Sequence, residues 1–317
     1  MCTAVRFTDD CGNGYFGRNY DWTFSYGELP VLTPKAYKAY SPFGAIETIK
    51  NPVLGTGIVF NNIPLYFDAS NAAGLSCANL NFAQYAVYEK EPKEGNTNVC
   101  VFEFPMWVTS QFTTVDEVEE ALATTTIVDK PVSEQFPSSP THWMIADNKR
   151  SIVVECTKHG MEIHHNDVDV LTNQPGYEWH HDNLRNYMRL TNQFPTESSW
   201  STVKMVPFGT GAGNDGLPGG CGAAARFVRA AYYNTLHPVC TTENANVARM
   251  LHTLSGVAMI DGATTVSDGK FEKTLYSSCF SAKTGTYYFN TYDDFNVKSA
   301  SFNDFDLDSS ELQKMGE

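Results

Sequence analysis

The sequence contains no apolar run that approaches the roughly 20 residues a membrane span requires. Its start, MCTAVRFTDD, lacks the basic and apolar regions of a secretory signal. Cationic residues are few, since 22 Lys and Arg stand against 36 Asp and Glu, for a formal net charge of -14. This excess of negative charge disfavours nucleic acid and anionic membrane surfaces as partners. We therefore expect a cytoplasmic protein that binds neither membrane nor nucleic acid.

Several motifs of common chemistry are also absent. The eight cysteines form no CxxC pair, which favours reduced thiols over a disulfide framework or a zinc site. No GxSxG elbow is present, which argues against a serine hydrolase. The letters GxGxxG occur at 211–216 but precede Leu217-Pro218, not a helix. The paired histidines at 164–165 and 180–181 point in different directions on a strand or helix, so we interpret them as surface or core residues. We expect no metal and no cofactor.

The most informative residue present is Cys2, which follows only an initiator methionine. If Met1 is removed, one residue carries both a thiol, with an ordinary pKa of about 8.5, and an α-amine, with an ordinary pKa of about 8. Near neutral pH such an amine can take the proton of the thiol, as it does in N-terminal threonine nucleophiles. Cys2 is thus a candidate nucleophile. The alternative is an ordinary small residue near the end of the chain.

The residues after Cys2 predict a hairpin. Residues 2–8 alternate as a strand does, turn formers follow at 9–14, and 15–19 is typical of the returning strand. A turn centred near Gly12 pairs residues whose numbers sum to about 23. This pairing places Arg18 and Asp21 close to Cys2, so that a cation and a carboxylate lie beside the candidate nucleophile.

Other segments indicate the class of fold. We expect strands at 57–60, 74–79, 142–146 and 151–157, and a second hairpin at 273–280 and 286–291. Apolar spacing and a capping box predict a helix from residue 115 and helices at 182–190, 223–236 and 243–254. The segment 131–140 is predicted as a surface loop. Hairpins grouped with amphipathic helices favour an α+β fold, and no linker divides the chain, so we expect a single domain over residues 1–317.

Six segments occur in order along nearly the whole chain: MCTAVRF, FGRNYDWTFSYGE, ANLNFAQY, VLTNQPGYEWHHDNLRNY, GLPGGCGAAARFVRAAY and YYFNTYDD. Together they resemble the choloylglycine hydrolase family of N-terminal nucleophile hydrolases, and within it the bile salt hydrolases. The resemblance implies an αββα four-layer sandwich with two antiparallel sheets between helical layers. It also implies removal of Met1 and hydrolysis of glycine- or taurine-conjugated bile salts.

The resemblance further assigns catalytic residues to this chain. Cys2 attacks the amide, Arg18 favours its thiolate, and Asp21 orients the α-amine. Asn81 and Asn173 correspond to oxyanion donors, and the second arginine of the family falls on Arg226, which holds the surroundings of Cys2. Without the resemblance, the arginine and aspartate near Cys2 would be interpreted as a surface ion pair, the asparagines as turn caps, and the second arginine as a solvated helix residue.

The resemblance also implies an apolar wall for the steroid. The positions that match it are Tyr20, Phe60, Phe67, Val132 and Phe136. A steroid needs such a wall because each buried CH₂ contributes about 0.8 kcal/mol. Core packing is the alternative role for each of these side chains.

Two other functions stay open at this point. Penicillin V acylases or other acyl amidases of the same family share the fold and the nucleophile, although the acylases tend to carry tyrosine at the position of Asn81. A non-catalytic protein that binds apolar ligands is the alternative of a different class. The resemblance implies a homo-oligomer, often a tetramer. The sequence distinguishes neither glycine from taurine nor one steroid nucleus from another.

Overall fold

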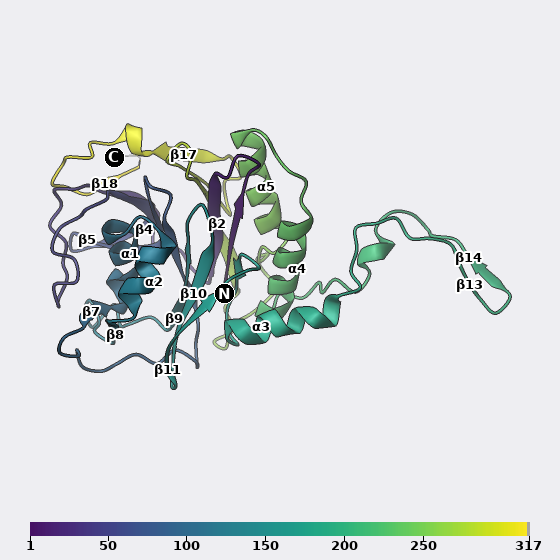
Figure 1. The fold of residues 1–317 in the computed structure, drawn as a ribbon, viewed down its shortest axis with the longest axis horizontal. Helices are drawn as coiled ribbons and strands as arrows, with labels where there is room; N and C mark the ends of the chain where they lie inside the picture. Colours follow the sequence, from purple (N-terminus) through teal and green to yellow (C-terminus); the bar gives the residue numbers. More distant parts are fainter. Residues whose placement is uncertain (316–317) are drawn as a thin grey trace.

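Two antiparallel sheets lie face to face between two layers of helices in the computed structural model, which describes residues 1–315 (Figure 1). Helices α1 (Phe104–Gln111) and α2 (Val115–Leu122) cover one sheet, and α4 (Ala223–Leu236) and α5 (Glu243–Ser255) cover the other. Helix α3 (Tyr177–Asn183) packs against α4. Among the described residues, no helix has the length and apolarity that crossing a membrane requires.

The sheet that contains the N-terminus has six strands. Their spatial order is β12 (Val170–Leu171), β1 (Cys2–Thr8), β2 (Gly14–Trp22), β15 (Lys273–Ser281), β16 (Thr286–Thr291) and β17 (Lys298–Ser301). Every pairing in it is antiparallel. Because β1 lies between β12 and β2, the segment after residue 171 is brought beside the start of the chain.

The second sheet has eight strands. Their order is β11 (Gly160–His165), β10 (Ser151–Thr157), β9 (Thr141–Ala146), β6 (Ser76–Asn81), β5 (Ile63–Asn71), β4 (Val53–Phe60), β3 (Leu29–Thr33) and β18 (Gln313–Lys314). Side chains of both sheets share one apolar core, in which Cys2 and Ala4 of β1 join Leu80 and Met144. Strand β6 therefore faces the start of β1.

The remaining elements are short. A parallel pair joins β7 (Thr97–Cys100) to β8 (Thr125–Val128), and β13 (Ser198–Trp200) pairs with β14 (Val203–Met205) in an arm that projects from the body (Figure 1). Single 3-10 turns occur at Val101–Glu103, Leu184–Tyr187, Ala212–Asn214 and Phe302–Asp304.

Helices α2, α4 and α5 form where the sequence pattern predicts them, whereas α1 was not predicted. Helix α2 begins at Thr114, whose side chain accepts a hydrogen bond from the backbone of Glu117, and it buries Val115, Val118 and Leu122 along one face. Helix α5 begins in the same way at its N-cap Thr242. The predicted strands and the 131–140 loop are confirmed as well, with only small shifts at their ends.

The helix predicted at 182–190 is displaced. Helix α3 starts at Tyr177 and ends at Asn183, and the chain continues as a 3-10 turn only to Tyr187. The start depends on a contact with another strand, because the Glu155 carboxylate of β10 accepts the backbone N–H of Tyr177 at 3.1 Å. The local spacing of apolar residues cannot predict a helix start that is stabilised by a side chain from another strand.

The predicted hairpin exists, but its register differs by one residue. Cys2 pairs with Tyr20 and Ala4 with Arg18, so that paired numbers sum to 22, and the turn is centred on Cys11. Directly opposite residues point to the same face of an antiparallel sheet. The side chains of Cys2 and Arg18 thus share the face between the sheets, whereas Asp21 points to the helix-covered face.

Close packing of β2 gives a test of this architecture. A methyl group on Gly17 would lie 2.2 Å from the Ser278 carbonyl oxygen of β15 and 2.8 Å from Met250 Cγ of α5. We expect Gly17→Ala to lower the free energy of unfolding by about 1–3 kcal/mol, since overpacking forces strand and helix apart. Urea unfolding followed by circular dichroism measures this change. Gly209→Ala is the matched control, because nothing lies within 4 Å of the added methyl group; equal midpoints for both variants would contradict the packing argument.

Candidate active site

The sulfur of Cys2 is held by a buried arginine. Cys2 is the first residue of β1 and is 4% exposed, and Arg18 Nη2 donates to Cys2 Sγ at 2.7 Å. Arg18 Nη1 donates to the carbonyl oxygens of Phe67, at 2.6 Å, and Asn79, at 2.8 Å, on two strands of the opposite sheet. The Arg18 guanidinium therefore joins the two sheets, and its Nη2 contacts the thiol of Cys2.

The charge of Arg18 is retained in this buried position. Burial opposes the cation, but its electrostatic interactions with Cys2, Tyr276 and Asp68 outweigh burial and raise the pKa of Arg18 above its ordinary value. A permanent cation in hydrogen-bond contact with sulfur stabilises the thiolate, which is the reactive form of cysteine. The predicted pairing of Arg18 with the nucleophile is present in the geometry.

Asp21 lies on the other face of β2 and is fully buried. Its Oδ1 accepts a hydrogen bond from Thr274 Oγ1 at 2.6 Å. Its Oδ2 accepts none within residues 1–315 and lies 3.9 Å from Arg226 Nη1. Burial raises the pKa of Asp21, while Arg226 and the terminal amine oppose that rise. A buried acceptor oxygen is thus open to one more donor close to the chain start.

Met1 occupies the space in front of the candidate nucleophile. Its amine forms an ion pair with Glu272 and donates to the Asp21 carbonyl oxygen at 3.1 Å. While Met1 is present, the nitrogen of Cys2 is a peptide N–H that donates to Asn173 Oδ1 at 2.8 Å. The amine that the candidate chemistry needs is created only when Met1 is removed.

Asn173 and Arg226 together fix the backbone of Cys2, the first residue of β1. Asn173 Oδ1 accepts from both the Cys2 nitrogen and Arg226 Nη2, the latter at 2.6 Å. Arg226 Nη1 donates to the Cys2 carbonyl oxygen at 2.5 Å and to Thr3 Oγ1 at 2.6 Å. Burial lowers the pKa of Arg226, against the charges of Asp21 and Cys2. Arg226 is a buried residue that positions the chain start.

The two asparagines predicted as oxyanion donors differ in their contacts. Asn173 Nδ2 already donates to the Asn81 carbonyl oxygen at 2.8 Å. Asn81 Oδ1 accepts from the backbone of Ala83 at 3.1 Å, whereas its Nδ2 donates to no acceptor within the described part of the chain. The side-chain NH₂ group of Asn81 is therefore free to donate, while the Asn173 side chain holds the Asn81 backbone through its carbonyl oxygen.

Two of the predicted wall residues lie beside Arg18. The rings of Tyr20 and Phe67 stack at 4.4 Å with an interplanar angle of 2°, and Tyr20 also stacks on Tyr276 at 5.5 Å. Arg18 Cζ lies 5.0 Å from the centre of the Tyr20 ring. These rings form an apolar surface directly next to the candidate nucleophile.

The other predicted wall residues form a separate group. Phe60, at the end of β4, packs on Phe136 of the 131–140 loop with ring centres 4.7 Å apart. Val132, in the same loop, is half-buried. No ring contact within the described residues joins this group to Tyr20 or Phe67. The five positions thus fall into two clusters, one at Arg18 and one between a hairpin end and a loop.

A buried carboxylate behind Arg18 was missed by the sequence analysis. Asp68 is 3% exposed and accepts hydrogen bonds from Tyr276, from Tyr287 at 2.6 Å and from Ser278 at 3.3 Å. Burial raises its pKa, and the charge of Arg18 opposes that rise. Strand β5 is buried on both faces, so no alternation of polar residues marks this position in the sequence.

Histidines next to the site were also underestimated. His180 is fully buried, and its Nε2 lies 2.8 Å from the Asn173 carbonyl oxygen, while His181 is partly exposed. His142 is buried between Glu155 and the Thr172 carbonyl oxygen. Helical spacing from Tyr177 could have placed His180 on the buried face of α3. No local pattern marks His142.

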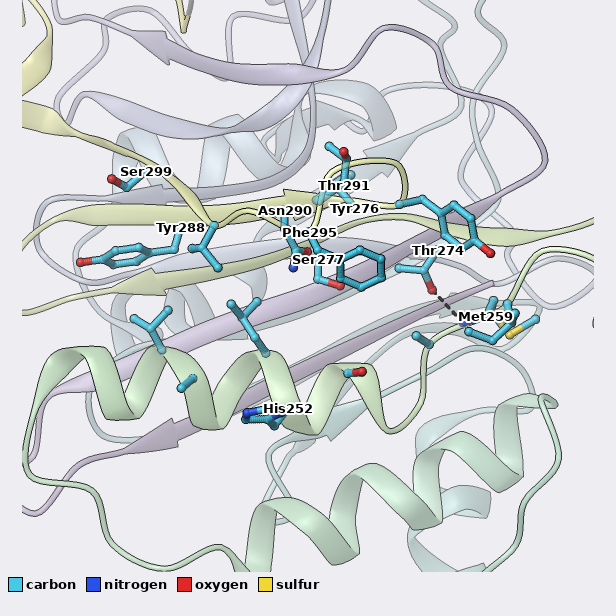
Figure 2. A pocket seen from close by; sticks show the side chains of 18 of the residues that line it. His252, Met259, Thr274, Tyr276, Ser277, Tyr288, Asn290, Thr291, Phe295 and Ser299 are labelled. Atoms are coloured by element: carbon cyan, nitrogen blue, oxygen red, sulfur yellow. Dashed lines mark hydrogen bonds between the residues drawn. The ribbon is translucent and has the colours of Figure 1, made fainter.

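A groove of about 640 Å³ opens elsewhere, between α5 and strands β15 and β16. Figure 2 shows Tyr288, Asn290 and Phe295 across this space from His252 of α5. None of the six predicted catalytic residues lines it. The groove lies on the outer face of the sheet, opposite to the face that carries the sulfur of Cys2.

The chain was compared with known proteins. The family model for linear amide C–N hydrolases of the choloylglycine hydrolase family matches residues 2–315. The bile salt hydrolase/transferase of Bifidobacterium longum subsp. longum is 51% identical over 313 residues, which are 98% of this chain and 98% of that protein.

Solved structures agree with the sequence comparison. A crystal structure of a variant of the conjugated bile acid hydrolase from Clostridium perfringens matches with a TM-score of 0.93 at 35% identity, covering 100% of this chain and 97% of that chain. Penicillin V acylase from Agrobacterium tumefaciens matches with a TM-score of 0.77 at 19% identity, covering 99% of this chain and 91% of the acylase, and shares the fold. The predicted αββα architecture is confirmed, and the chain belongs to the choloylglycine hydrolase family.

Proposed function

We propose that this protein hydrolyses the amide bond of glycine- or taurine-conjugated bile salts, with Cys2 as nucleophile after removal of Met1. The observation that carries the proposal is the pair of contacts on Cys2, with Arg18 at its sulfur and Asn173 at its nitrogen. Full-length similarity to a bile salt hydrolase/transferase supports the substrate class.

The new N-terminus activates the thiol. Once Met1 leaves, the α-amine of Cys2 keeps Asn173 Oδ1 as an acceptor, and the unpartnered Asp21 Oδ2 is the nearby carboxylate oxygen available to orient it. The unprotonated amine acts as the general base and takes the proton of the thiol, as the α-amine of an N-terminal threonine does for its hydroxyl. Arg18 stabilises the resulting thiolate.

The reaction then passes through two tetrahedral intermediates. The thiolate attacks the amide carbon, and Asn81 Nδ2 donates to the oxyanion, a contribution that typically equals about 100 to 1,000-fold in rate. The C–N bond breaks as the α-ammonium gives its proton to the departing glycine or taurine. Water, deprotonated by the same amine, attacks the thioester carbon. The C–S bond then breaks, which releases the bile acid, and the α-ammonium returns its proton to the sulfur.

The steroid packs on the aromatic surface next to Arg18. Tyr20 and Phe67 present stacked rings at this place, and Phe60 with Phe136 forms a second apolar group at the edge of β4. Val132 belongs to the same loop as Phe136 and completes the proposed wall. Apolar contacts of this kind bind the steroid rings of the bile acid. They do not select between glycine and taurine, since they touch only the steroid part of the substrate.

We further propose that the chain acts as one domain, in a homo-oligomer, in the cytoplasm. The site draws residues from both sheets and from α4, which supports a single working unit. The projecting arm exposes apolar side chains, namely Met188, Phe194, Trp200, Val203, Val206 and Phe208, which supports a partner copy covering them. Its tetrameric form is implied by the family. A catalytic thiol is kept reduced in the cytoplasm.

Side-by-side assays of glycocholate, taurocholate and penicillin V test the substrate class. We expect turnover of both conjugated bile salts, intact mass lacking one methionine, and a loss of at least about 1,000-fold in Cys2→Ser, since the attacking sulfur is gone. Cys11→Ser, at an exposed thiol, is the matched control and should keep full activity. A retained Met1 in active protein, or turnover of penicillin V alone, would contradict the proposal.

Replacing Arg18 by methionine tests the thiolate. Loss of an adjacent positive charge typically changes a pKa by 1–3 units, so we expect iodoacetamide to label Cys2 at least about tenfold more slowly at pH 7. Peptide mass spectrometry follows the reaction, and the exposed Cys11 in the same sample is the internal standard. Equal labelling of Cys2 in both proteins would show that Arg18 does not stabilise the thiolate.

Two substitutions in the arm test the oligomer. We expect Trp200→Ser combined with Phe208→Ser to shift the protein to a smaller species in mass photometry, because apolar contact area is lost. Val239→Ser, at a residue that is 70% exposed between α4 and α5, is the control. An unchanged mass in the double variant would exclude the arm as the contact.

A further inference from the structure

A buried charged cluster holds the backbone on both sides of Asn173. Glu155 of β10 is 2% exposed, and its Oε1 lies 2.8 Å from Nδ1 of His142, which is fully buried on β9. The other ring nitrogen of His142 lies 3.1 Å from the Thr172 carbonyl oxygen. The same carboxylate accepts the N–H of Tyr177 at 3.1 Å. The segment 172–177 is therefore held at one end by His142 and at the other by Glu155.

The hydrogen bonds define the charge of this pair. Burial would raise the pKa of Glu155, but hydrogen bonds from His142 and then His164 lower it to about 2, so Glu155 is a carboxylate. A carboxylate and a carbonyl oxygen are both acceptors. His142 satisfies both only if each ring nitrogen carries a proton, which makes it an imidazolium in a buried ion pair.

His180 supports the same peptide from helix α3. Burial lowers its pKa to about 4, so the ring is neutral at pH 7. Its Nδ1 has no partner within the described residues, and its Nε2 faces the Asn173 carbonyl oxygen at 2.8 Å, so the proton lies on Nε2. The ring stacks on Phe227 at 4.8 Å, next in sequence to Arg226. His180 thus connects Asn173 with the helix that carries Arg226.

His142 also touches the segment of the second asparagine. Its ring stacks on Phe82, directly after Asn81, with centres 4.2 Å apart and an angle of 7°. One buried imidazolium therefore contacts the chain next to both asparagines of the site. The Glu155 carboxylate, which pairs with His142, is closely packed, because a methyl group on Gly176 would lie 2.8 Å from Glu155 Oε2. Only glycine fits there without moving the carboxylate.

We propose that His142 and Glu155 are positioning residues for the hydrolysis, and that their ion pair holds the Thr172–Asn173 peptide in place beneath Cys2 and Asn81. The inference rests on the proposed function. Neither side chain contacts the sulfur. Their effect passes through Asn173, whose side-chain oxygen accepts from the Cys2 nitrogen and whose amide group donates to the Asn81 carbonyl oxygen.

Replacing the carboxylate of the pair removes one of its two acceptor oxygens. In Glu155→Gln an NH₂ donor takes the place of one oxygen, and it faces groups that are themselves donors, namely the rings of His142 and His164 and the N–H of Tyr177. We therefore expect at least one contact at the ends of the segment 172–177 to be lost.

The decisive experiment compares Glu155→Gln with the wild-type protein on glycocholate at pH 7. We expect kcat to fall about 10 to 100-fold with KM within about twofold, because a displacement of the site by about 1 Å costs this much. Glu162→Gln, at the exposed residue paired with Glu155 across β10 and β11, should match the wild type.

Hydrogen exchange provides a readout that needs no substrate. We expect peptides that cover residues 170–178 to exchange faster in Glu155→Gln, while the β15–β16 hairpin exchanges as in the wild type. A kcat within about twofold of the wild type, or unchanged exchange over 170–178, would overturn the inference. Failure of the wild type on conjugated bile salts would contradict the proposed function instead, and the exchange result would still decide whether the pair holds this segment.

Discussion

The structure of the site depends on one buried guanidinium. Arg18 leaves β2, crosses the space between the sheets, and donates to two backbone carbonyl oxygens of the opposite sheet as well as to the sulfur of Cys2. A buried cation is stable only with its donors satisfied, and this arrangement satisfies it with fixed backbone atoms instead of a mobile side chain. The distance between the sheets and the position of the sulfur are therefore set by the same group.

A second set of contacts fixes the chain start from the helical side. Arg226 of α4 binds the carbonyl oxygen of Cys2, the first residue of β1, and Asn173 binds its nitrogen. Arg18 acts on one face of the sheet and Arg226 on the other, so the end of the chain cannot fray as most termini do. A nucleophile at a terminus needs such restraint, because an N-terminal residue has a neighbour on one side only.

Much of the fold could be predicted from the sequence because the patterns concerned are local. The boundaries of α4 and β10 follow from apolar spacing and turn residues, and the hairpin follows from the run of turn formers at 9–14. The predicted register of the β1–β2 hairpin was wrong by one residue, since strand pairing depends on the length of the turn, which the sequence does not determine. Helix α3 was displaced because its cap comes from Glu155, 22 residues earlier in the chain.

The site could be predicted in part for the same reason. The resemblance assigned six candidate positions, and the hairpin placed Arg18 near Cys2. The neighbouring residues Asp68, His142 and Glu155 lie in strands that are buried on both faces and have no periodic signature. Their roles arise from contacts between elements distant in the sequence. Likewise, the sequence predicted candidate wall residues but not which of them contact each other, because the stacking of Tyr20 on Phe67 depends on how the two sheets face each other.

The ion pair between the Met1 amine and Glu272 has a further consequence for maturation. Excision of the neutral Met1 side chain would leave the number of charges in the molecule unchanged, but it would move the terminal ammonium along the chain by one residue, about 3.8 Å. The positive charge would leave the Glu272 carboxylate and come closer to Asp21, whose second oxygen accepts no hydrogen bond within residues 1–315. The proposed processing would therefore relocate a charge within a fold that already holds both acceptors.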